Sequence, residues 1–507
     1  MQAAHRVAKN TLILYARMAI TVFISLYSTR LVLAALGVSD FGLFNVVGGV
    51  ISMLGFLNAS MAAATQRFIS FAQGARDPEK VKRIFNMSSL LHWGIAILVF
   101  IVLEIAGYFF FNGIFNIAPD RVGVAKLIYQ FMVVSTLFTV ISVPYEAVIT
   151  SHENMMVYAI LGIVEAVLKL AIAFYITYSA HDHLVLYGLL MAILSIVLLI
   201  MKRIYCHRNY PECELNFKKY YDPLLLKEVR VFAGWSLLGS SSSMVSSYGQ
   251  GILMNIFFGT IVNTAQSIAN QISGQLGVFA GTLQKALNPS IDKSEGAGNR
   301  DKMIRQTLIG SKFSFFLLSI TFLPVLIEMP FILKIWLDKI PPPTIIFCRL
   351  LLIRNLIEQF SVTITTSIAA VGNISKFQRI SSLLNIIPLI STYIFFSLEF
   401  QSYFLYVIYL IYSLIQTCLV LYYAKVNFEF SPSYYFKKVI FPCIMVFLIA
   451  FITSTIPFFI LNSSGSRLIS TCLISLIITP FLFWHIGLTE NEKKQILGIY
   501  SHLRNRL

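Results

Sequence analysis

The first candidate for chemistry in this chain is an arginine inside a long apolar run. Arg17 lies within residues 8–36, which are long and apolar enough to cross a bilayer. An arginine at membrane depth costs about 3 kcal/mol or more unless it meets protein, water or an opposite charge. Guanidinium stays charged and binds phosphate oxygens through two parallel hydrogen bonds. Arg17 therefore predicts a site for an anion, with phosphate as the best fit.

Small polar side chains share the helix face of Arg17. At 100° per residue they fall within a sector roughly 80° wide, whereas the other sectors are apolar. These residues are Asn10, Thr21, Ser25 and Ser28. Such a stripe predicts a wet cavity in front of the arginine.

A second polar face runs along residues 261–288. Its members are Asn263, Gln266, Asn270, Ser273, Gln284 and Asn288. The preceding stretch, 228–258, is rich in serine and adds Ser240, Ser243 and Ser247. Both stretches fit helices that line a cavity. They equally fit close packing between membrane helices, which small and polar residues also permit.

Two opposite-charge pairs lie inside other apolar runs. Glu165 and Lys169 are four residues apart, as are Arg354 and Glu358. On a helix this spacing lets the two side chains pair with each other, and a self-paired couple is often structural. Arg349 has no such local partner and lies near a helix end, where it can snorkel to the interface.

The composition predicts a polytopic membrane protein. The chain has 507 residues, of which 57% are hydrophobic and only 12% charged, whereas soluble proteins are about twice as charged. The formal net charge of +16 resides mostly in short loops, as in the cytoplasmic loops of membrane proteins. A basic soluble module for nucleic acid is missing, so we expect no nucleic-acid partner.

Apolar runs separated by polar or Gly/Pro breaks predict an all-α protein with about fourteen transmembrane helices. The expected limits are 8–36, 42–72, 84–111, 121–149, 154–178, 183–205, 228–258, 261–288, 306–333, 345–371, 378–399, 402–424, 438–461 and 467–487. Loop lysines and arginines concentrate on one side of the membrane, which places both termini in the cytoplasm. The loops of the other side hold only Arg121, Lys334, Lys339 and Arg467.

The sequence repeats itself at an offset of 259 − 37 = 222 residues. Gly37 then corresponds to Gly259, and GARDPEKVKR (74–83) corresponds to GAGNRDKMIR (296–305). We interpret this as two six-helix lobes in a parallel repeat, as in other two-lobed transporters. The expected domains are residues 1–205, a cytoplasmic linker 206–227, residues 228–424, and a pair of additional helices with a tail in 425–507.

Catalytic signatures are missing from the sequence. It contains no G-x-x-x-x-G-K-[ST] and no H-E-x-x-H motif, and the loops expected outside are too short for a catalytic domain. The six cysteines fit neither a disulfide framework nor a zinc pattern. We therefore expect no enzyme, no cofactor and no metal site.

The opening stretch, KNTLILYARMAITVFISLYSTRLVLAALGVSDFGLF, resembles the multidrug/oligosaccharidyl-lipid/polysaccharide (MOP, MATE-like) exporter superfamily. It has an Asn near the start of the first span, a polar-studded helix, and the turn L-G-x-x-D-F-G-x-[FY] at Leu36–Phe44. Within the superfamily the chain is most similar to Wzx-type O-antigen flippases, and the resemblance covers essentially the whole chain.

The resemblance implies a flippase of a bacterial inner (cytoplasmic) membrane. Its substrate would be an undecaprenyl-diphosphate-linked oligosaccharide, such as a lipopolysaccharide repeat unit, moved to the outer leaflet by alternating access. Arg17, Lys169 and Arg354 would bind the anionic headgroup, and Glu165 or Glu358 would serve H⁺ or Na⁺ coupling. Membrane lipids and polysaccharide assembly enzymes are expected partners of a monomeric chain.

Three alternatives remain open from the sequence. One is a cation-coupled multidrug exporter. Another is a lipid II flippase of the same superfamily, whose first-helix arginine Arg17 matches. The most remote is a membrane-embedded polysaccharide polymerase.

Overall fold

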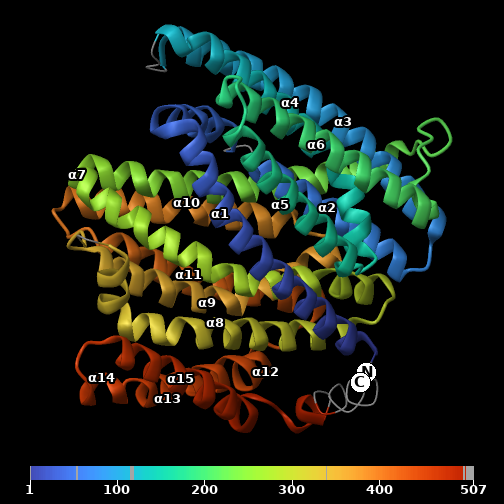
Figure 1. Ribbon diagram of the computed structural model, residues 1–507. Coiled ribbons are helices and arrows are strands. Elements are labelled where there is room, and N and C mark those ends of the chain that lie inside the picture. Colours follow the sequence, from blue (N-terminus) through green and yellow to red (C-terminus); the bar gives the residue numbers. More distant parts are fainter. Residues whose placement is uncertain (1, 53–54, 115–118, 338–339, 495–496, 498–507) are drawn as a thin grey trace. The chain divides into compact units, whose positions relative to one another are not determined.

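Helices make up almost all of the chain (Figure 1). The computed structural model describes residues 2–52, 55–114, 119–337, 340–494 and 497, and no strand occurs among them. The main helices are α1 (Gln2–Ser52), α2 (Gly55–Gly74), α3 (Pro78–Phe109), α4 (Val122–Ser151), α5 (Met155–Thr177), α6 (His183–Asn209), α7 (Pro223–Gly296), α8 (Arg300–Trp336), α9 (Thr344–Val371), α10 (Ser375–Ser397), α11 (Phe404–Phe428), α13 (Phe441–Ser454) and α15 (Gly465–Leu482).

Shorter helical pieces complete the path. They are the π-helices Phe110–Ile114, Phe436–Ile440 and Phe483–Gly487, the 3-10 turns Pro119–Arg121 and Pro211–Cys213, and the short helices α12 (Pro432–Tyr435) and α14 (Ile456–Ile460). The all-α membrane architecture predicted from the sequence is confirmed. The thin break expected at Glu399–Gln401 is also confirmed, because α10 ends at Ser397 and α11 begins at Phe404.

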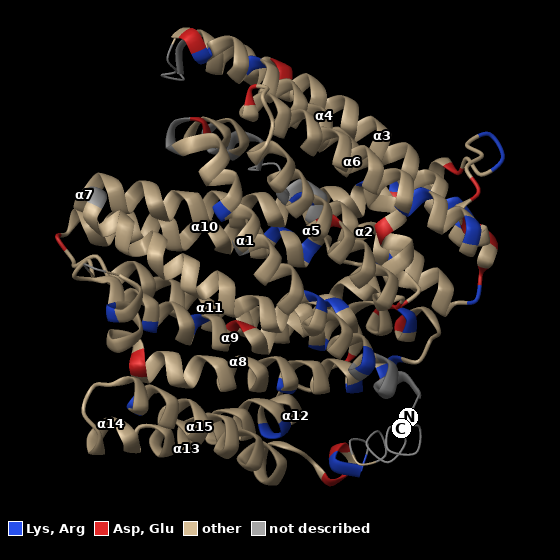
Figure 2. Ribbon diagram, viewed as in Figure 1, with Lys and Arg blue, Asp and Glu red and all other residues tan. Residues whose placement is uncertain are grey.

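Ten stretches of the described residues are long and apolar enough to cross a membrane. The four predicted spans outside this set are 42–72, 228–258, 261–288 and 345–371. The last three carry the serine run, the amide-rich face and the charges Arg349, Arg354 and Glu358. Such helices need protein or water along one side, since lipid cannot satisfy polar groups. In Figure 2 the middle of most helices is free of charged residues.

Glycines at equivalent positions of the repeat share an unusual backbone conformation. Gly37 has φ 73° and ψ 171° inside α1, and Gly259 has φ 75° and ψ −171° inside α7. A side chain would be strained at these angles, which glycine adopts freely. The sequence predicted breaks between spans at 37–41, within the turn Leu36–Phe44, and at 259–260, and the structure has a kink between two helices at both places. The chain bends sharply at the glycine and stays helical on both sides.

A second pair of positions that correspond in the repeat lies in the two short basic loops. Arg76 and Gly298 both have a positive φ, of 57° and 70°. The next residues, Asp77 and Asn299, begin α3 and α8 as N-caps and accept hydrogen bonds from backbone N–H groups three residues later. These positions are again 222 residues apart. The two six-helix lobes predicted from the repeat, followed by two further helices, are confirmed.

Residues 9–237 form one compact unit, here the N-terminal unit. Within it α4 is central and packs against α2, α3 and α6. α6 ends at Asn209 and α7 begins at Pro223, so only 210–222 of the predicted linker 206–227 lies between long helices. Asn86 in α3 holds this link, because its amide donates to the carbonyl of Glu214 at 2.9 Å and its oxygen accepts from the N–H of Asn216.

Residues 1–8 and 238–507 form the other compact unit, here the C-terminal unit. α9 has the place that α4 has in the N-terminal unit, since it packs against α8 and α11. The additional helices α13 and α15 pack against α8 (Figure 1). The domain limits predicted from the sequence, at residues 205, 227 and 424, remain a prediction.

Candidate functional site

Arg17 of α1 packs against α5. Its Cζ lies 4.4 Å from the centre of the Tyr158 ring, within the range of a cation–π contact. One turn further along α5, Gly162 leaves room for the guanidinium. A Cβ atom on Gly162 would lie 2.2 Å from Nε and 2.5 Å from Cζ and Nη2 of Arg17. Tyr158 and Gly162 therefore form a slot on α5 that holds the arginine head.

The charge of Arg17 lacks a protein counterion in the part of the chain that the structure describes. No carboxylate there lies within 4 Å of it, and its buried Nε has no hydrogen-bond acceptor. A buried donor without an acceptor costs about 1–3 kcal/mol, and more when it is charged. The site is thus basic, and an acceptor from outside the protein would relieve this cost.

The other polar residues of this α1 face make local contacts. Asn10 is buried, and its amide donates to the carbonyl of Glu153, directly before α5, at 2.9 Å. Thr21 and Ser28 donate to the carbonyls of Met18 and Ile24 in their own helix. Ser25 is exposed. Asn10 and Arg17 thus both meet the start of α5, which the helical periodicity of α1 could not show.

Glu165 and Lys169 continue the arginine-facing side of α5. Their positions follow Gly162 by three and seven residues, which places all three on one face of the helix. Lys169 Nζ donates to Glu165 Oε1 at 2.6 Å, and the two side chains are 43% and 38% exposed. The expected pairing is confirmed, and the pair remains open to water or ligand.

In the C-terminal unit, the polar face of α7 meets a polar face of α9. Asn355 donates to Ser273 at 2.6 Å. Gln284 donates to Gln359 at 3.2 Å. Thr366 donates to Asn288 at 3.3 Å. Three of the predicted cavity-lining residues are therefore joined to a neighbouring helix by interhelical hydrogen bonds.

The serine run of α7 is joined to α10 and α11. Asn385 donates to Ser242 at 3.0 Å and to Ser243 at 3.1 Å, and it accepts from Tyr412. Ser246 and Tyr409 share a hydrogen bond of 2.7 Å. These contacts form a continuous polar cluster across three helices.

Arg354 and Glu358 extend this cluster from α9. Arg354 Nε donates to Glu358 at 2.8 Å, and its Cζ lies 5.0 Å from the centre of the Tyr409 ring. The pairing expected from the i, i+4 spacing is confirmed. Unlike Arg17, Arg354 has a carboxylate partner in its own helix.

The remaining residues predicted to line a cavity are spread along α7 and do not form one cluster. Gln266 is 2% exposed, and its Oε1 has no partner among the described residues. Asn263 lies beside it, since both side-chain oxygens are close to Gly251. Ser247 donates to the Ser243 carbonyl. Ser240 is partly buried and Asn270 is exposed.

Sequence reasoning missed the most deeply buried charges. Glu328 of α8 is fully buried and binds Arg467 of α15, with Oε2 at 2.7 Å from Nη2 and 3.1 Å from Nε. Lys312 of α8 is 1% exposed and binds Glu492 at 2.8 Å. Two charges inside one predicted span were a signal, but their partners lie 139 and 180 residues away. The first pair fastens α15 to α8, and the second fastens the segment that follows Gly487 to α8.

Comparisons with known proteins agree with this architecture. The MatE family model matches residues 14–175. No curated protein matches the sequence. Among solved structures, one described as MATE in the straight conformation has 13% identity and a TM-score of 0.73, covering 84% of this chain and 96% of that chain.

Two other solved structures are similar to the same degree. An outward-facing multidrug resistance MATE family transporter of the MOP superfamily has 13% identity, a TM-score of 0.72 and coverages of 84% and 95%. A MOP superfamily transporter from Pyrococcus furiosus, described as having a binding pocket of reverse polarity, has the same values. The chain is therefore a multi-pass membrane protein with the fold of the MATE transporters.

Proposed function

We propose that this chain is a membrane transporter for an anionic lipid-linked saccharide. The preferred substrate is an undecaprenyl-diphosphate-linked oligosaccharide, moved by alternating access from the cytoplasmic to the outer leaflet of a bacterial inner membrane. The proposal rests mainly on Arg17. Among the described residues, its buried Nε has no hydrogen-bond acceptor and its guanidinium has no carboxylate within 4 Å.

The chemistry of a diphosphate suits this site. Guanidinium binds phosphate oxygens bidentately, and the Tyr158 face stabilises the cation without neutralising it. Lys169 is the proposed second cation on α5, and it can exchange Glu165 for a phosphate oxygen because the pair is partly exposed. Arg354 stays a proposed headgroup residue of the C-terminal unit.

The polar cluster of the C-terminal unit offers groups for sugars. Hydroxyl and amide groups of Ser243, Asn385 and Tyr412 match the donors and acceptors of saccharide hydroxyls. Moving about two negative charges outward against an inside-negative potential gains about 2.3 kcal/mol per charge per 100 mV. This term alone supplies a direction for transport.

One structurally similar protein supports a function other than drug export for this chain. For the Pyrococcus furiosus transporter, the reverse polarity of the binding pocket is described as suggesting a different function for that protein. In this chain Arg17 has no carboxylate within 4 Å among the described residues, which favours an anionic substrate.

A cation-coupled multidrug exporter is the second candidate. Glu165 and Glu358 favour it, since each is a partly exposed carboxylate inside a helix that could exchange its cation for H⁺ or Na⁺. Another neighbour is described as a multidrug resistance transporter. In this case both carboxylates would be needed for transport, and Arg17 would not.

The test is flipping of a fluorescent undecaprenyl-diphosphate oligosaccharide in proteoliposomes. Arg17→Ala should slow flipping at least about tenfold, because a hydrogen bond to a charged group is worth about 1.5–3 kcal/mol. Arg17→Lys should retain part of the rate. Arg30→Ala on the same helix is the matched control, because Arg30 is exposed, and it should flip like the wild type.

Equal rates for Arg17→Ala and the wild type would remove this mechanism. Efflux of a cationic dye by the same vesicles, driven by a pH or Na⁺ gradient and lost in Glu165→Gln, would favour the exporter. Faster flipping of lipid II than of the oligosaccharide would reassign the substrate within the superfamily.

A further inference from the structure

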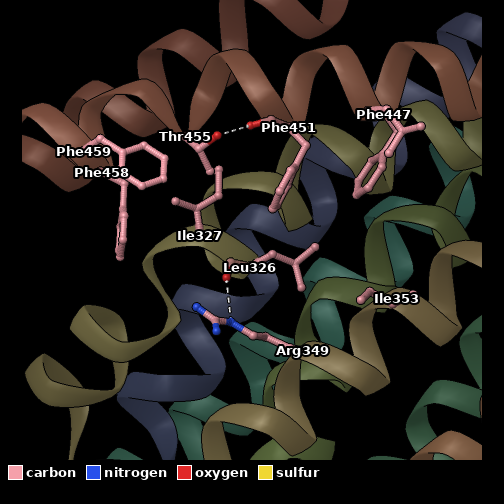
Figure 3. A pocket seen from close by; sticks show the side chains of 10 residues that line it. Leu326, Ile327, Arg349, Ile353, Phe447, Phe451, Thr455, Phe458 and Phe459 are labelled. Atoms are coloured by element: carbon pink, nitrogen blue, oxygen red, sulfur yellow. Dashed lines mark hydrogen bonds between the residues drawn. The ribbon is translucent and has the colours of Figure 1, made fainter.

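An apolar cavity with one arginine lies within the C-terminal unit, outside the clusters described above. It has a volume of about 530 Å³ and lies between α8, α9, α13 and α14. In Figure 3 the rings of Phe447, Phe451 and Phe458 point from α13 and α14 into the space beside Arg349. This volume is within the range of small-molecule binding sites.

The polarity of the cavity is unbalanced. Eight of its ten lining residues are apolar, and the hydroxyl of Thr455 is already bonded to carbonyls of its own helix. Arg349 is thus the one lining side chain that offers free polar groups, and it is cationic. A ligand that fits must combine a long apolar part with an anionic group.

A proline fixes the position of Arg349. Pro330 has no N–H, so the carbonyl of Leu326, four residues earlier in α8, loses its helical partner. Arg349 Nε donates to this carbonyl at 3.1 Å. The guanidinium is anchored through Nε, and its two Nη groups have no hydrogen-bond partner among the described residues. They are left to bind a ligand.

The two buried charges beside the lining residues Ile327 and Phe458 neutralise each other. Glu328, next in sequence to the lining residue Ile327, is paired with Arg467, and Arg467 also lies over the Phe458 ring. No carboxylate of the described part of the chain lies within 4 Å of Arg349. The cavity therefore keeps one unbalanced positive charge, which complements an anion.

We propose that this cavity binds an anionic phospholipid, separately from the transported substrate. One acyl chain fills the space between Ile353, Phe447 and Phe451, and the phosphodiester binds the Nη groups of Arg349. The helices around the cavity are α8 and the stretch Pro432–Ile460, both apolar enough to span a membrane, so a membrane lipid reaches the site from the bilayer.

The test is native mass spectrometry of the purified, delipidated full-length protein. Phosphatidylglycerol and phosphatidylcholine with identical acyl chains are added separately. The wild type should bind phosphatidylglycerol about tenfold more tightly, as expected for a charged hydrogen bond. Arg349→Gln should lose this preference, and Arg349→Lys should keep most of it. Arg30→Gln is the control and should bind like the wild type.

Ile353→Trp tests the cavity without changing charge. By filling it, this variant should weaken binding of both lipids, and it decides the matter if Arg349→Gln fails to fold. An unchanged phosphatidylglycerol preference in Arg349→Gln, or unchanged binding in Ile353→Trp, would overturn the site. Displacement of phosphatidylglycerol by an equal amount of undecaprenyl phosphate would overturn the assignment to a phospholipid. None of these readouts depends on transport activity.

Discussion

The guanidinium of Arg17 occupies the space that a side chain on Gly162 would need. A Cβ atom there would lie 2.2 Å from the arginine Nε. The slot on α5 and the arginine on α1 are thus complementary, although they are 145 positions apart in sequence. A small change on α5 can therefore displace the charge without changing the arginine itself.

Gly162→Ala should abolish most oligosaccharide flipping, to the level of Arg17→Ala. The added methyl group pushes the arginine head away from the Tyr158 face. Thermal unfolding should change little, because the clash involves a flexible side chain and alanine favours a helix by about 1 kcal/mol over glycine. Flipping assays and unfolding midpoints measured on the same preparation check both expectations.

Gly94→Ala in α3 is the matched control for this substitution. A Cβ atom at Gly94 meets nothing within 4 Å. This variant should flip like the wild type. Normal flipping in Gly162→Ala would show that the arginine position in the slot does not matter for transport.

Breaking the buried ion pair between α8 and α15 should destabilise the protein strongly. Glu328→Gln or Arg467→Met alone should each cost about 3–5 kcal/mol, because a buried charge is left without its partner. The double variant should cost clearly less than the sum. A double-mutant cycle on unfolding free energies in detergent checks this coupling.

An ion pair with an exposed carboxylate provides the comparison. Lys493 Nζ lies 2.7 Å from Glu490 Oε1, and the Glu490 side chain is 79% exposed. Glu490→Gln should leave the unfolding midpoint unchanged, as is usual for exposed pairs. Additive effects in the Glu328 and Arg467 cycle would show that the pair does not act as a unit.

Ser475 of α15 should stabilise the protein only while Pro324 is present. Pro324 has no N–H for the Ile320 carbonyl four residues earlier, and Ser475 donates to this carbonyl at 3.3 Å. Ser475→Ala should cost about 1 kcal/mol. In a Pro324→Ala background the restored N–H at position 324 satisfies the carbonyl, and the cost should shrink. Unfolding free energies of the four proteins test this.

Thr479→Ala is the control for that cycle. Thr479 is buried on the same helix, and its hydroxyl has no partner among the described residues. Its effect should be the same with and without Pro324. An undiminished cost of Ser475→Ala in the Pro324→Ala background would contradict the proposed compensation.

Acidic pH should weaken the ion pair between Asp182, in the loop before α6, and Arg121. Burial opposes ionisation of Asp182, but hydrogen bonds from the Val185 N–H and from Arg121 outweigh it and lower the Asp182 pKa below its ordinary value of 3.8. A lowered pKa means that the ionised carboxylate stabilises the fold above the unfolded-state pKa. This contribution is lost as the pH falls through the folded-state value.

Asp182→Asn should therefore lower the unfolding midpoint at pH 7, and the difference from the wild type should shrink below about pH 4. Midpoints measured from about pH 7 to about pH 3.5 span this window and provide the check. A difference that is independent of pH would mean that the Asp182 charge contributes nothing to stability.

Local sequence was sufficient for most of the architecture. Apolar runs gave the helices, since only helices satisfy every backbone group in lipid. The 222-residue offset gave the lobes, and the conformations of Gly37 and Gly259 agree with it. The charged pairs at Glu165 and Arg354 were also predictable, because both partners lie one turn apart on the same helix.

Tertiary structure alone decided which neighbour each polar face meets. Helical periodicity placed Arg17 and Asn10 on one face, but it could not show that Tyr158 and Gly162 of α5, and the Glu153 carbonyl before α5, cover that face. Helical periodicity also could not decide whether the polar face of α7 lines a cavity or packs against another helix. In the structure, α9 forms hydrogen bonds with three residues of this face.

Arg467 is a further case in which the sequence did not show the packing partner. The distribution of lysines and arginines among the loops predicted that Arg467 lies in a loop on the outer side of the membrane. Its carboxylate partner is 139 residues away. The physical reason is that a helix fixes the direction of its side chains through local hydrogen bonds, whereas the choice of a packing partner depends on contacts between segments that are distant in the chain.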